Sequence, residues 1–253
     1  MVSSFAVDGA ETVPSTTPAG FGVVSPGMTI DRRGFLAATS VLSASFVSAP
    51  AAVAAAETPA SATTETLPDL AFDEARFAEA VNRPARHRQV FAVQNLGGGA
   101  PLSFIYASLT AYTQALHVPE RDVHIAAVLY HGYGTALVYG DAIWNAYVIP
   151  SLAEANAATA PKAGSGNPYL HALGDGAQRP FAVEALAKRG VSFFVCYNSV
   201  RAGAQMFAAR AKKPAAEVLA EMRAALVPGA MLVPAGVMAL NALQEARFTY
   251  ASG

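Results

Sequence analysis

Short apolar segments alternate with stretches of helical periodicity between residues 89 and 251, and this alternation limits the fold more than any other feature. The apolar segments predict strands over Gln89–Val93, Val123–Leu129, Val191–Val195, Met231–Val233 and Phe248–Ala251. The periodic stretches predict helices over Asp73–Val81, Pro101–Leu116, Thr135–Tyr147, Ala182–Lys188, Val200–Lys212, Ala215–Leu226 and Val237–Glu245. Strands that alternate with helices predict a mostly parallel sheet covered on both faces. We therefore expect a three-layer α/β/α domain with about five strands.

A pair of arginines precedes an uncharged run near the N-terminus. Arg32 and Arg33 are followed by Leu36–Val53, which is rich in Ala and Ser, and then by small residues. Basic, apolar and cleavage regions in this order predict a twin-arginine (Tat) signal peptide. The alternative is an uncleaved membrane anchor, but Ser, Thr and Pro50 dilute the run below the ~20 apolar residues that a span needs. We expect cleavage between 54 and 57 and a periplasmic or otherwise exported protein.

The chain divides by composition into three parts. Residues 1–56 form the predicted leader and signal peptide, residues 57–70 have the composition of a flexible linker, and residues 71–253 form the α/β domain. The first 27 residues are rich in Ser, Thr, Pro and Gly, and Met28 stands just before the paired arginines. Either Met1 or Met28 is therefore the start of translation.

Charge and motifs exclude several classes of function. Without residues 1–56 the chain has 15 acidic and 15 basic residues, and this balance argues against a nucleic-acid partner. The run Gly97–Gly99 lacks the Lys-Ser/Thr of a phosphate-binding loop, and no Gly-x-Ser-x-Gly elbow of an esterase occurs. No set of His, Cys and carboxylate residues has the spacing of a metal site, so we expect neither a metal nor another cofactor.

Polar residues follow the predicted strands at their carboxyl ends, where open α/β sheets bind ligands. The single cysteine, Cys196, cannot form an internal disulfide and is either a buried structural thiol or a reactive one. A helix predicted to begin near Ser199 would favour its thiolate, with Arg201 as a stabilising cation. His131 is either a base or orienting donor for this thiol or a residue that hydrogen-bonds a loop. The candidate binding residues are His131, Tyr133, Asn198, Ser199 and Arg201.

A long connection between residues 155 and 180 has little helical or strand signal and contains several glycines. Connections of this length inside a domain are usually functional or flexible. We expect either a lid over the site or an arm that clasps a neighbouring subunit.

Several segments also resemble a known family. Leu129–Gly132, Gly190–Ser199, and the pieces Val227–Gly229, Val233–Gly236 and Leu243–Glu245 occur in an order similar to that of DsrE/DsrF-like proteins, over most of residues 87–251. This resemblance implies a homo-oligomer, either trimer or hexamer, and a sulfur relay in which Cys196 is the catalytic residue that carries a persulfide.

Two functions follow as hypotheses. The first is an exported sulfur carrier or sensor that uses Cys196, exchanges sulfur with a donor or acceptor protein, and depends on the Tat translocase for export. The second is a noncatalytic oligomeric module that binds a small ligand or a partner protein, with Cys196 packed as a structural residue. An enzyme that acquires a cofactor before export is a weaker third possibility, and the sequence leaves enzymatic activity open.

Overall fold

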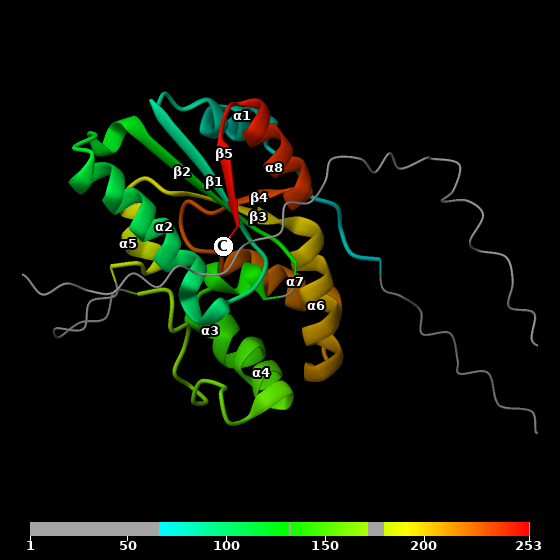
Figure 1. Ribbon diagram of the computed structural model, residues 1–253. Helices are drawn as coiled ribbons and strands as arrows, with labels where there is room; N and C mark the ends of the chain where they lie inside the picture. Colours follow the sequence, from blue (N-terminus) through cyan, green and yellow to red (C-terminus); the bar gives the residue numbers. More distant parts are fainter. Residues whose placement is uncertain (1–65, 132, 172–179, 253) are drawn as a thin grey trace, which may run out of the picture. The chain divides into compact units, whose positions relative to one another are not determined.

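A five-stranded parallel sheet forms the centre of the domain (Figure 1). The computed structural model describes residues 66–131, 133–171 and 180–252, so the predicted leader and signal peptide lie outside the described residues. The strand order is β4-β3-β2-β1-β5. The strands are β1 His87–Val93, β2 Val123–Leu129, β3 Ser192–Cys196, β4 Met231–Val233 and β5 Thr249–Ser252. Each lies within about two residues of its predicted position, and the predicted α/β class is confirmed.

The central strand β2 explains why the sheet is covered on both faces. All seven of its residues are buried, as expected for a parallel strand that contacts apolar layers above and below. It pairs with β1 in the register His87↔Val123 and with β3 in the register Ala126↔Ser192.

Helices form one layer on each side of the sheet (Figure 1). On one face, α1 (Glu74–Asn82) and α8 (Gly236–Glu245) enclose a smaller core with alternate strand residues such as Val90 and Phe194. The opposite face holds the larger core, which contains Val93 and Phe193. Its helices are α2 Ala100–Thr110, α5 Val183–Lys188, α6 Tyr197–Ala211 and α7 Ala215–Ala224.

The region after β2 differs from the single helix predicted over Thr135–Tyr147. A 3-10 helix, Gly134–Val138, ends in an extended residue at Tyr139, which forms an antiparallel bridge with Leu226. The helix then restarts as α3 (Asp141–Ile143), a π-helical turn (Trp144–Val148) and α4 (Ile149–Asn156). The bridge breaks the helix because its backbone groups pair with another segment. The wider turn admits Pro150, which lacks an N–H for the regular helical ladder.

The connection after α4 runs from 157 to 182, two residues later than predicted, because α4 extends to Asn156 and α5 begins at Val183. Its buried Asn167 donates through Nδ2 to the carbonyls of Leu137 (3.0 Å) and Tyr139 (2.8 Å). One side chain therefore satisfies backbone groups that the helix break leaves without helical partners. The middle of this connection, residues 172–179, lies outside the described residues.

Candidate functional site

The carboxyl ends of β1, β2 and β3 bring the predicted site segments together. The Tyr130 amide donates to the carbonyl of Val93 (3.0 Å), and Gln94 Nε2 donates to Tyr130 Oη (2.8 Å). The segment after β2 is in turn tied to the segment after β3, since the His131 amide donates to Ser199 Oγ (2.8 Å). Adjacent parallel strands place their C-terminal residues at one edge, so residues 68 positions apart meet there.

A cavity of about 310 Å³ opens at this edge; we call it the carboxyl-edge crevice. Four of the predicted binding residues line it. The lining residues are His131, Tyr133, Asn198, Ser199, Ala202, Gly203 and Met206. Tyr133 Oη is held by a 2.6 Å hydrogen bond with Ser151 Oγ. The crevice thus combines fixed polar groups with a small apolar wall.

The spacing of residues along α6 explains which of its side chains reach the crevice. Residues three and four positions apart share a helix face, so Asn198, Ala202 and Met206 form one row and Ser199 and Gly203 the next. The three small or apolar members of these two rows, Ala202, Gly203 and Met206, were not predicted. Their helical spacing from Asn198 and Ser199 was the available signal.

Cys196 lies below this surface. It ends β3, is the N-cap residue of α6, and is only 6% exposed. A Cβ added to Gly236 would lie 3.3 Å from Cys196 Cβ and 2.6 Å from Tyr130 Cβ, so these three residues pack tightly. Cys196 is not among the residues that line the crevice. Helix α6 also begins earlier than predicted, immediately after the cysteine.

Arg201 is not part of the crevice lining, and its hydrogen bond and ion pair go to the segment before α1. Its Nη2 donates to the carbonyl of Leu67 (3.2 Å), and its Nη1 lies 3.7 Å from Asp69 Oδ1. Arg201 follows Tyr197 by one helical turn, on the flank of α6 that faces the N-terminal segment. The Tyr197 hydroxyl donates to the carbonyl of Pro68 (2.6 Å).

These contacts attach the last residues of the predicted linker, residues 66–70, to the domain. Leu67 is 2% exposed and belongs to the larger core. Residues 66–70 have no regular secondary structure, yet they are attached to α6 by two side chains. The part of the predicted linker that the structure describes is therefore packed on the domain.

In residues 66–131, 133–171 and 180–252, no group of three or more His, Cys, Asp or Glu side chains is arranged to hold a metal ion. Within the same ranges, no helix has the length and apolar character to cross a membrane.

Comparison with known proteins gives a fold-level match. No protein-family model matches the chain, and no curated protein matches it. A similar solved structure is that of a protein of unknown function, MTH1491, from Methanobacterium thermoautotrophicum. That protein is 17% identical over 66% of this chain and 99% of its own length, with a TM-score of 0.37. Similarity at this level gives no information about function.

Proposed function

We propose that the protein is a noncatalytic module that binds a small polar ligand in the carboxyl-edge crevice, with Cys196 as a packed structural residue. The observation that carries this proposal is the convergence of His131, Tyr133, Asn198 and Ser199 on one cavity of about 310 Å³. Binding sites for small molecules are concave, partly apolar and equipped with a few fixed polar groups. The burial of Cys196 favours this function over one that needs an accessible thiol.

The ligand class follows from the donors around the crevice. Helix α6 has fifteen residues and begins at this edge, and its N-cap side chain makes no capping hydrogen bond. The first N–H groups of a helix have no intrahelical acceptor and carry the positive end of the helix dipole. Together with the Asn198 amide and the Ser199 hydroxyl, they favour a ligand with acceptor oxygens, such as a small carboxylate or a polyhydroxylated acid.

A ligand screen followed by calorimetry tests this proposal. Small organic acids that raise the melting temperature of the wild type are expected to bind Asn198→Ala at least ~10-fold more weakly, because a hydrogen bond to a charged group is worth roughly 1.5–3 kcal/mol. Gln205→Ala, on the same helix but outside the crevice lining, is the matched control and should bind normally. Cys196→Ser should also bind normally. Equal affinity of Asn198→Ala and wild type, or no ligand in the screen, would contradict the proposal.

Oligomerisation and export belong to the same proposal. The resemblance described above supports a trimer or hexamer, and the paired arginines support export as a folded protein. Light scattering on the protein without residues 1–56 should give three or six times the chain mass. A monomer would overturn this part of the proposal.

A second candidate is sulfur transfer by Cys196. It is favoured by the position of Cys196 as the N-cap of α6, where the helix dipole stabilises a thiolate. The thiolate would attack the terminal sulfur of a polysulfide or of a donor persulfide. The sulfur–sulfur bond of the donor would break and its remaining thiolate would leave, so no oxidant is needed.

Intact-mass measurement after exposure to polysulfide distinguishes the two candidates. Sulfur transfer predicts added sulfur on the wild type and none on Cys196→Ser. Thiol labelling of the folded protein gives a second reading: fast labelling supports transfer, whereas slow labelling supports the packed cysteine. No added sulfur on the wild type, or equal addition to both proteins, contradicts sulfur transfer.

A further inference from the structure

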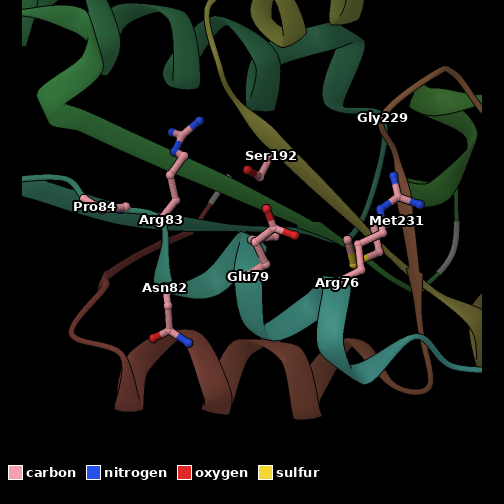
Figure 2. A pocket seen from close by; sticks show the side chains of 9 residues that line it. Arg76, Glu79, Asn82, Arg83, Pro84, Ser192, Gly229 and Met231 are labelled. Atoms are coloured by element: carbon pink, nitrogen blue, oxygen red, sulfur yellow. The ribbon is translucent and has the colours of Figure 1, made fainter.

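A second cavity, of about 590 Å³, lies at the opposite edge of the sheet, where the strands begin (Figure 2). We call it the amino-edge cavity. Helix α1 and the residues after it supply one wall, Ser192 at the start of β3 supplies another, and Met231 at the start of β4 a third. Figure 2 shows Arg83, Ser192 and Glu79 around one hollow, with Arg76 and Met231 farther along it.

Positive charge is concentrated at this edge. A neighbouring cavity of about 440 Å³ shares Arg83 and Pro84 with the first. Their combined charged lining is Arg76, Arg83, Arg121, Lys188 and Arg189 against Glu79 and Glu120. The whole chain has 17 basic and 18 acidic residues, so this excess of cations is local. Like charges repel when they are gathered in one place, and a bound anion would relieve the repulsion.

Some of these cations are already neutralised, and others are not. Arg189 is paired with Glu120 at 2.6 Å, and Arg121 lies 3.9 Å from Asp122. Within the described part of the chain, Arg76, Arg83 and Lys188 take part in no ion pair.

Arg83 is the most constrained of these three. Its Nε is buried and has no hydrogen-bond partner among the described residues. Its guanidinium lies against Gly190, where an added Cβ would be 3.2 Å from Nη1. Burial lowers the pKa of Arg83, but an arginine stays charged at neutral pH. A partly buried cation without an anionic partner is unfavourable, so the site favours an incoming anion.

The floor of the cavity adds a neutral hydrogen-bonding pair. Ser192 Oγ lies 3.0 Å from Nε2 of His124, which is fully buried. Burial, with Arg83 and Arg88 nearby, lowers the pKa of His124 to about 3, so the ring is neutral at neutral pH. With its proton on Nε2, the imidazole donates to Ser192, and the hydroxyl proton of Ser192 is available to an acceptor in the cavity.

From this arrangement we propose that the amino-edge cavity binds a small molecule that carries a tetrahedral oxyanion, a phosphate or a sulfate group, through Arg83 and Ser192. A guanidinium matches two oxygens of such a group at once, and the Ser192 hydroxyl supplies a third donor. Arg76 adds positive charge in the same cavity, and Lys188 adds it in the neighbouring cavity. The carboxylate of Glu79, on the same cavity, can accept a hydrogen bond from a hydroxyl group elsewhere on the bound molecule. This site is separate from the carboxyl-edge crevice and does not depend on its function.

Calorimetric titration of the mature protein with inorganic phosphate, inorganic sulfate and glycerol phosphate tests the proposal. We expect saturable binding of at least one of the three. Tighter binding of glycerol phosphate identifies an organic ligand, and equal binding identifies the free ion. Arg83→Gln should weaken binding at least ~10-fold, and Ser192→Ala by less. Arg76→Gln, on the exposed side of α1, keeps the test valid if Arg83→Gln fails to fold.

Two control variants distinguish binding at a specific site from nonspecific attraction of anions to positive charge. Arg210→Gln removes a cation that pairs with Glu154 and lies outside both amino-edge cavities, so it should bind as the wild type does. Asn198→Ala alters only the carboxyl-edge crevice and should also bind normally. The proposal is overturned if no titrant saturates, if Arg83→Gln and Arg76→Gln both bind as the wild type does, or if Arg210→Gln loses binding equally.

Discussion

At the scale of single residues, the carboxyl edge depends on close packing around Gly236, the first residue of α8. The backbone there approaches Tyr130 more closely than a side chain permits, since an added Cβ would lie 2.6 Å from Tyr130 Cβ, and it leaves a tight 3.3 Å to Cys196 Cβ. Both obstructing atoms are Cβ atoms, which cannot rotate away. The same close approach holds Cys196 beneath the crevice.

Gly236→Ala is therefore expected to lower the free energy of unfolding by about 1–3 kcal/mol, as overpacking generally does, and to speed thiol labelling of Cys196. Urea denaturation and labelling kinetics measure the two effects. Gly203→Ala is the control, because its added Cβ has its tightest contact, 3.3 Å, with the flexible end of Met222 and alanine is the better helix former. Equal stability of Gly236→Ala and wild type would contradict the packing described.

His124 gives the fold a dependence on acid. Its pKa is about 3 in the folded protein and 6.5 in a solvated chain, so between these values the unfolded state binds a proton that the native state excludes. Stability is fully present above pH 6.5 and falls as the pH drops towards 3, with a slope of at most about 1.4 kcal/mol per pH unit from this group.

His124→Gln should flatten this pH dependence, since glutamine does not titrate. The measurement is urea denaturation at several pH values between 7 and 4, compared with wild type. His117→Asn, which changes an exposed histidine, should leave the slope as it is in the wild type. A slope in His124→Gln equal to that of the wild type would show that His124 is not the source.

At the scale of elements, α6 contacts the core with one face, and its two exposed flanks contact different parts of the protein. Its buried face, which includes Val200, Ala204 and Phe207, packs on the larger core. One exposed flank lines the crevice, whereas the other holds the segment before α1 through Tyr197 and Arg201. The helix therefore links the position of the N-terminal segment to the geometry of the crevice.

Tyr197→Phe removes the hydroxyl that donates to the Pro68 carbonyl at 2.6 Å. We expect a loss of about 1 kcal/mol in unfolding free energy and faster protease cleavage within residues 66–70. Limited proteolysis followed by mass spectrometry measures the second effect. Tyr250→Phe, at a half-exposed tyrosine of β5, is the matched control and should be cleaved as slowly as the wild type.

At the scale of the whole molecule, the charges are nearly balanced in number but not in position. Each edge of the sheet has its own cavity: a crevice with polar side chains where the strands end, and a cavity lined by arginines where they begin. Opposite edges of a parallel sheet are separated by the strand length, so the two proposed sites are distinct. The predicted signal peptide is expected to act before the domain reaches its final compartment.

Export is tested on the full chain. Replacing Arg32 and Arg33 by Lys should retain the protein in the cytoplasm at its full mass, because the twin-arginine route requires the arginine pair. The wild type should appear in the periplasm with an N-terminus between 54 and 57. A chain begun at Met28 should be exported equally if the preceding residues are dispensable. Export of the double lysine variant would rule out the predicted route.

The local sequence pattern was sufficient to predict most of the fold. Strands and helices could be predicted from residues close in sequence, and the parallel arrangement follows from their alternation. The rule that ligands gather at carboxyl ends then identified His131, Tyr133, Asn198 and Ser199, which line one cavity. The break at Tyr139 was missed because the bridge that causes it comes from Leu226, far along the chain.

The sequence by itself determined the class of fold and the segments that meet at the carboxyl edge, since both depend on periodicity and strand order. Only the tertiary structure decided which flank of α6 faces the crevice. Asn198 and Arg201 lie close together in the sequence, and only the fold shows that Asn198 lines the crevice whereas Arg201 contacts the segment before α1. The tertiary structure also decided that Cys196 is packed under Gly236. The cationic cavity required the same information, as Arg83, Lys188 and Arg121 come from separate segments that only the folded sheet brings to one edge.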